Sequence, residues 1–114
     1  MPMIVTHTTA AITEEKKEAL TRAFGEAITL LPGKNEAYLM LEFQGECSMA
    51  FHGDTKLPLA FVEVKILGKS TREAYAALTA RICDVLKDTL GIPTEGTYVK
   101  YEEIEHWGHD RHNF

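Results

Sequence analysis

Hydrophobic and polar positions follow one another along the chain in an order that predicts two strand–helix–strand units. Residues 3–8 form a short segment rich in β-branched side chains, as is typical of a strand. Residues 38–44, 60–67 and 97–103 alternate between apolar and polar positions, which predicts three more strands. Between these segments, apolar residues recur every three or four positions in two longer stretches, which indicates two amphipathic helices.

Both predicted helices carry signals at their ends. Thr13 offers a hydroxyl cap to the first helix, and Pro32 with the glycine after it predicts its end. Ser70 and Glu73 have the S-x-x-E spacing of a capping box before the second helix, which we expect to stop at 91–93. The apolar stripes of the two helices are Leu20, Phe24, Ala27 and Leu31, then Leu78, Ile82, Val85 and Leu86.

Two β-α-β units in tandem predict an α/β (α+β) fold in which a four-stranded sheet carries two helices on one face. Residues 49–52 and 113–114 are candidates for short additional edge strands. The face without helices would hold Tyr38, Met40, Glu42, Phe61, Glu63, Lys65, Tyr98 and Lys100. A mixed, partly apolar face of this size favours association between subunits, so we expect the chain to form a homo-oligomer.

Length and composition restrict the functional classes. At 114 residues, with 45% hydrophobic and 25% charged residues, the chain is expected to be a single domain spanning 1–114. The net charge of −5 argues against a nucleic-acid surface, and no apolar run is long enough to cross a membrane. The N-terminus lacks the pattern of a secretory signal, so we expect a cytoplasmic protein whose Cys47 and Cys83 are buried, reduced thiols.

Six segments occur in order along almost the whole chain: MPMI, GKNEAYLML, SMAFHGD, ILGKS, TYVKY and WGHDRHNF. Together they resemble the macrophage migration inhibitory factor family within the tautomerase superfamily. The resemblance implies two β-α-β units assembled as a symmetric trimer with active sites at subunit interfaces. It also implies a cofactor-independent, phenylpyruvate tautomerase-like isomerase that acts on arylpyruvate-type 2-keto acids.

The resemblance makes Pro2 the general acid–base, once Met1 has been removed. A free prolyl amine must have its protonated form disfavoured to act as a base near neutral pH, and apolar surroundings and nearby lysines both do this. Such a base can take the α-proton of a 2-keto acid and return it to oxygen or carbon. The structural alternative is a proline that merely starts a strand.

The resemblance assigns Lys34 to the substrate carboxylate and to lowering the pKa of the Pro2 amine. Its alternative is a solvated lysine that follows a helix end. Leu67 falls where the family has a pocket residue whose backbone contacts the substrate. Its alternative is a core residue at the end of a strand.

Tyr98 and Lys100 are two residues apart in a predicted strand and therefore project from the same face. By resemblance, this pair reaches into the active site of a neighbouring subunit. Animal members usually have asparagine at the position of Lys100. The lysine would add a cation that attracts a carboxylate, and this difference leaves the exact substrate open. Its alternative is an exposed strand lysine.

The resemblance also places Met3, Tyr38 and Phe114 at the mouth of the pocket, where they would suit a flat aryl group. Alternatively, they serve only in packing. His109 departs from a tryptophan usual in animal members. His106, His109 and His112 recur every third residue, but they lack a typical zinc pattern, and we interpret this tail as a polar surface with no metal or other cofactor.

Two other functions stay open at this stage. The family includes cytokine-like members, so a signalling homologue with a receptor is one alternative, and family members can leave cells without a signal peptide. Another proline-based reaction, such as hydration, dehalogenation or decarboxylation of a small carboxylic acid, is the other.

Overall fold

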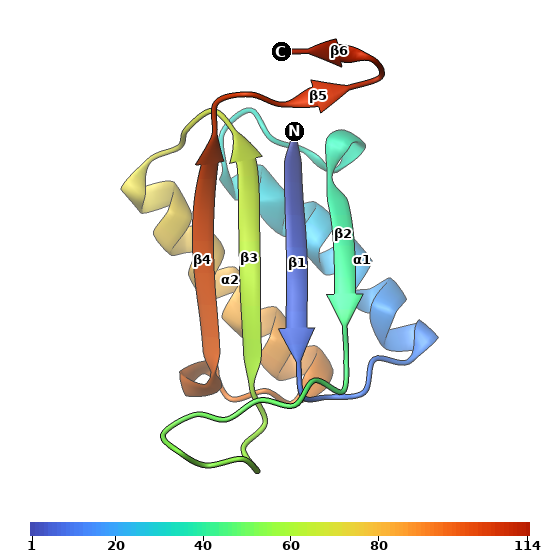
Figure 1. The fold of residues 1–114 in the computed structure, drawn as a ribbon, viewed down its shortest axis with the longest axis vertical. Helices are drawn as coiled ribbons and strands as arrows, with labels where there is room; N and C mark the ends of the chain where they lie inside the picture. The colour runs from blue at the N-terminus through green and yellow to red at the C-terminus, as the bar shows by residue number, and fades with distance from the viewer.

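A computed structural model describes all of residues 1–114 and shows a four-stranded sheet with two helices on one face (Figure 1). The sheet order is β2-β1-β3-β4. In chain order the helices and strands are β1 (Pro2–Thr8), α1 (Glu14–Ala27), β2 (Met40–Gln44), β3 (Ala60–Leu67), α2 (Arg72–Leu90), β4 (Thr97–Ile104), β5 (Gly108–His109) and β6 (His112–Asn113).

The predicted repeat of two β-α-β units is confirmed. β1 pairs in parallel with β2, and β3 pairs in parallel with β4. The antiparallel pairing of β1 with β3 joins the two units at the centre of the sheet. As a result, β1 begins at the end of the sheet where β3 and β4 finish, and the N-terminus lies beside their last residues (Figure 1).

The core lies between the sheet and the two helices. Alternate residues of the strands face the helices, because side chains of a strand point to opposite faces in turn. Phe24 of α1 and Ile82 of α2 are fully buried against them. The sheet contributes Ile4, Ala60, Val62, Val64 and Ile66 to this core, and the helices contribute Leu20, Phe24, Ala27, Leu78, Ile82 and Leu86. Burial of each large apolar side chain contributes about 1.5–3 kcal/mol.

The cap of the second helix differs from the prediction. Thr71, and not Ser70, is the capping residue, since its Oγ1 accepts a hydrogen bond of 3.1 Å from the backbone N–H of Ala74. The backbone N–H of Ser70 instead binds the hydroxyl of Tyr75. The capping box with Glu73 is therefore wrong. The Thr13 cap of the first helix is confirmed, with a bond to the N–H of Lys16.

Two element ends also differ. Residues Glu36–Tyr38 form a turn of 3₁₀ helix capped by Asn35, so β2 begins at Met40 instead of residue 38. In the first helix, the α-helical part ends at Ala27, and a 3₁₀ turn over Ile28–Leu30 completes it before Pro32. Short 3₁₀ turns are common at helix ends and as connectors, and hydrophobic spacing does not distinguish them from their neighbours.

The two expected edge strands do not join the sheet. In residues 49–52 the only pairing is a local bridge between Phe51 and Asp54. The C-terminal residues form a separate hairpin of β5 and β6, which lies beyond the end of the sheet near the N-terminus (Figure 1). Cys47 and Cys83 are free, as expected, but only half-buried. Neither helix is long and apolar enough to span a membrane.

Candidate active site

The start of β1 places Pro2 at the end of the sheet, in the middle of the strand order. Pro2 is buried and pairs in register with Ile66 of β3. Its nitrogen is joined to the carbonyl of Met1, whose oxygen accepts a hydrogen bond of 3.0 Å from the N–H of Leu67. The N-terminal residues and the end of β3 are therefore held together through the backbone.

Lys34 reaches the same place from the loop after α1. Gly33 has a φ of +82°, a left-handed conformation that turns the chain after Pro32. The half-buried Lys34 then donates from Nζ to the carbonyl oxygen of Leu67 at 2.9 Å. The pKa of the amino group of Met1 is lowered, chiefly by partial burial and then by the positive charge of Lys34. The structure thus brings together the N-terminus, Lys34 and Leu67.

The three expected wall residues lie around this end of the sheet. Met3 is half-buried and pairs with Met40 on β2. Tyr38 is 57% exposed, and its ring meets the ring of His109 edge-on at 6.0 Å. His109 in turn stacks on Phe114 at 6.5 Å. His109 therefore belongs to this wall. In the sequence, the only signal for this role was that His109 lies in the WGHDRHNF segment.

Tyr98 and Lys100 lie away from Pro2 in the same chain. Ile66, the partner of Pro2, pairs with Glu103 on β4, so Tyr98 is five residues further along the sheet. At 3.3 Å per residue this separation is about 17 Å. One chain alone does not bring these two predicted residues to the N-terminus.

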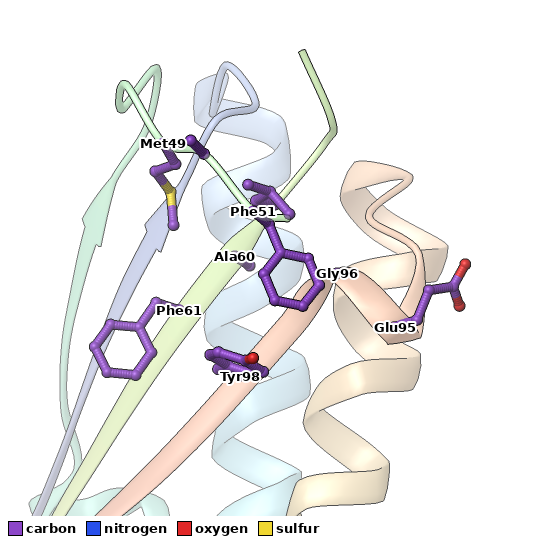
Figure 2. Close-up of a pocket in the computed structure, with 9 residues that line it drawn as sticks. Met49, Phe51, Ala60, Phe61, Glu95, Gly96 and Tyr98 are labelled. Atoms are coloured by element: carbon purple, nitrogen blue, oxygen red, sulfur yellow. The ribbon is translucent and has the colours of Figure 1, made fainter. Parts of the chain in front are cut away.

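Tyr98 instead lines an apolar cavity of about 80 Å³ at the other end of the sheet (Figure 2). Its ring meets that of Phe51 edge-on at 5.4 Å, and Met49 and Phe61 face the same space. Phe51 and Met49 come from the loop after β2 that sequence patterns suggested as an edge strand. Tyr98 itself is 60% exposed, so its ring is supported on one side and open on the other.

Lys100 is part of an ion network on the face without helices. Its Nζ lies 2.8 Å from Glu102 Oε1 and 3.2 Å from Glu63 Oε1. Glu63 Oε2 lies 2.8 Å from Nε2 of His7. The hydrogen bonds that Lys100 donates to Glu102 and then to Glu63 raise the pKa of Lys100, while hydrogen bonds with His7 and Lys100 lower the pKa of Glu63. Within its own chain, the charge of Lys100 is compensated by two carboxylates.

The histidine-rich tail shows no metal site, since no group of three or more histidine, cysteine, aspartate or glutamate side chains is placed to hold an ion. At the end of the sheet near the N-terminus, the structure places a terminal amine, a lysine, backbone groups of Leu67 and an aromatic wall.

Comparison with known proteins shows the family and the fold of the chain. The family model of macrophage migration inhibitory factor (MIF) matches residues 1–110. The chain belongs to the MIF family. This family is part of the tautomerase superfamily. A comparison with curated proteins finds no significant match.

Solved structures share the fold over 90% to 100% of this chain. The crystal structure of Leishmania major MIF2 is 30% identical, with a TM-score of 0.93, and the match covers 100% of this chain and 97% of that one. The MIF homologue of Prochlorococcus marinus is 26% identical, with a TM-score of 0.88 and coverage of 98% of both chains. A fused 4-OT protein described as a symmetric trimer is 22% identical, with a TM-score of 0.78, covering 90% of this chain and 85% of that one.

Proposed function

We propose that this MIF-family protein is a cofactor-independent keto–enol tautomerase of arylpyruvate-like 2-keto acids, active once Met1 is removed. The observation that carries the proposal is the meeting of the N-terminus, Lys34 and Leu67 at one end of the sheet. Burial and Lys34 lower the pKa of the Met1 amine; a free Pro2 amine beside the same lysine would have its protonated form disfavoured in the same way, which suits proton transfer near neutral pH.

The chemistry needs one proton and no external reactant. The free amine of Pro2 takes the α-proton of the keto acid, and the electron pair of that C–H bond forms the enol double bond as the carbonyl π electrons move to oxygen. The same proton then returns to the oxygen to give the enol, or to carbon in the reverse direction. Lys34 binds the carboxylate and stabilises the negative charge that develops beside it.

The aryl group would pack against the wall formed by Met3, Tyr38, His109 and Phe114. These side chains provide apolar and aromatic surface, and the exposed ring of Tyr38 leaves room for a flat substituent. This wall favours binding of an arylpyruvate over binding of a small aliphatic keto acid.

The first prediction concerns this substrate class. With protein whose intact mass confirms that Met1 is absent, ketonisation of phenylpyruvate enol, followed by ultraviolet absorbance, should run well above the rate in buffer. The enol of a small aliphatic 2-keto acid should react with a lower kcat/KM, because it leaves the aromatic wall unfilled. If neither enol reacts faster than in buffer, the proposed function is wrong, and a binding role or another proline-based reaction takes its place.

We also propose that the protein is a trimer in which Tyr98 and Lys100 complete the site of a neighbouring subunit. The fused 4-OT protein of the same fold is a symmetric trimer. The face without helices exposes Met40 and Tyr98 by 64% and 60%, which a second copy would cover. The separation of Tyr98 from Pro2 within one chain also fits a site shared between chains.

The second prediction tests this shared site by mixing two impaired variants. Pro2→Ala subunits keep Tyr98, and Tyr98→Ala subunits keep Pro2. After the two are refolded together in equal amounts, one site in each mixed trimer would be complete, so about a quarter of wild-type activity should return. Each variant refolded alone is the control. If the mixture is no more active than the mean of the two variants, the site does not span subunits.

A further inference from the structure

We propose that Tyr75 and Glu103 are positioning residues for Lys34, which they fix in place through the turn that follows β3. The inference rests on the proposed function, since Lys34 is the group assigned to the substrate carboxylate. The turn comprises residues 67–70. One end of it carries the carbonyl oxygen that Lys34 binds, and the other end is bound by Tyr75 and Glu103.

The first end of the turn is tied to the sheet and to Lys34. Leu67 pairs with Ile104, and the N–H of Gly68 donates to the carbonyl oxygen of Ile104 at 2.9 Å. Gly68 has a φ of +84°, so the chain leaves β3 in the left-handed region that favours glycine. The Gly68 N–H belongs to the same peptide plane as the Leu67 carbonyl, so the bond to Ile104 and the position of the residues that follow Gly68 together set the direction of that carbonyl.

The second end is held by a closed set of three hydrogen bonds. The N–H of Ser70 donates to the hydroxyl of Tyr75 at 3.1 Å and lies 3.4 Å from Oε2 of Glu103. The Tyr75 hydroxyl donates to the same Oε2 at 2.7 Å. The turn is thus joined at once to α2, which carries Tyr75, and to β4, which carries Glu103.

Both anchoring groups keep their roles over a wide pH range. Burial, followed by the hydrogen bond to Glu103, raises the pKa of Tyr75 to about 12, so the phenol remains a donor. The hydrogen bond from Tyr75 lowers the pKa of Glu103, so the carboxylate remains an acceptor. The Tyr75 ring also packs on Tyr101 at 4.4 Å, whose hydroxyl donates to the Tyr75 carbonyl.

Helix capping does not explain this arrangement. The cap of α2 is supplied by Thr71, whose hydroxyl accepts from Ala74. Ser70 precedes the cap, so the bond from its N–H to Tyr75 satisfies no amide of the helix. The bond instead fixes the turn, which connects directly to the carbonyl that Lys34 binds.

The test compares Tyr75→Phe with Tyr101→Phe in the full chain lacking Met1. Tyr75→Phe removes only the hydroxyl that binds Ser70 and Glu103. Tyr101→Phe removes a hydroxyl from the same helix–strand contact, where it bonds to Tyr75 and Thr79 but not to the turn. We expect Tyr75→Phe to raise KM for phenylpyruvate enol about fivefold, the effect of one ordinary hydrogen bond, with kcat changed less than about twofold. Tyr101→Phe should leave KM unchanged.

A second readout does not require activity. Nuclear magnetic resonance titration of the Pro2 amine should show a higher pKa in Tyr75→Phe, because a displaced Lys34 repels the protonated amine less. Glu103→Ala should behave in the same way, whereas Glu103→Gln keeps an oxygen acceptor for Tyr75 and should restore the wild-type pKa. An unchanged amine pKa in Tyr75→Phe, or an equal shift in Tyr101→Phe, overturns the inference. If wild-type protein has no activity, the proposed function is wrong. The pKa of the Pro2 amine in the variants would still show whether Tyr75 and Glu103 position Lys34.

Discussion

Replacement of Pro2 by alanine in protein lacking Met1 is expected to reduce kcat for phenylpyruvate enol by about 100-fold or more. General acid–base catalysis by a positioned group contributes roughly 10²–10⁴-fold. Alanine leaves a primary amine at the terminus, so some proton transfer would persist, but it lacks the ring that fixes the nitrogen at the start of β1. The measurement is the steady-state rate at several pH values, with the intact mass of each sample confirmed.

Two control proteins test whether the loss of activity is specific to the Pro2 amine. Pro93 follows the C-terminal end of α2 and caps the 3₁₀ turn that begins at Thr94. Pro93→Ala should therefore leave kcat unchanged. Wild-type protein that retains Met1 should be at least as impaired as Pro2→Ala, because the nitrogen of Pro2 is then an amide with no basic electron pair. If Pro2→Ala keeps the wild-type rate, Pro2 has no catalytic role.

Replacement of Lys34 by alanine is expected to lower kcat/KM by about 10- to 100-fold, mainly through KM. A hydrogen bond to a charged group contributes about 1.5–3 kcal/mol, and Lys34 is the cation that contacts the end of β3 beside the N-terminus. The lysine is half-buried, so its attraction for a carboxylate is less screened than at an open surface. Steady-state kinetics with phenylpyruvate enol measure the effect.

The pH dependence of Lys34→Ala has a definite sign. Lys34 lowers the pKa of the Met1 amine, and the same positive charge is expected to lower the pKa of the Pro2 amine once Met1 is absent, so removal of Lys34 should raise that pKa. The amine acts as a base only when deprotonated, and the acidic limb of the kcat/KM profile should therefore move to higher pH. Lys56→Ala, which removes an exposed lysine of the loop before β3, should change neither the limb nor KM. A Lys34→Ala limb that stays in place would contradict the electrostatic role of Lys34.

Hydrophobic periodicity was sufficient for the architecture, because burial against one core determines which positions must be apolar. Phe24 and Ile82 are fully buried as their spacing predicts. The cap of α2 could not be read from the sequence in the same way. Ser70 and Thr71 are adjacent hydroxyl residues, and the choice between them depends on Tyr75 and Glu103, which meet the turn only in the folded chain.

The candidate site likewise has features that the sequence predicts and features that only the folded chain determines. Lys34 and Leu67 were assigned through a resemblance, and the structure places them in direct contact. The distance of Tyr98 from Pro2 depends on strand order and register, which a single sequence does not contain. The compensated charge of Lys100 likewise depends on Glu63, a residue 37 positions away that becomes a neighbour only through β3–β4 pairing.

The hydrogen bond between Met1 and Leu67 gives removal of the first residue a second effect. The Met1 carbonyl is the acceptor for the N–H of Leu67, and it leaves with the methionine. One cleavage would therefore expose a basic nitrogen and also release a backbone donor beside it, next to the Lys34 ammonium. An oxygen that gains negative charge during enolisation could take the place of that carbonyl. Under the proposed function, the unprocessed N-terminus would act as a covalently attached inhibitor, whose amide oxygen would occupy the position of a substrate oxygen.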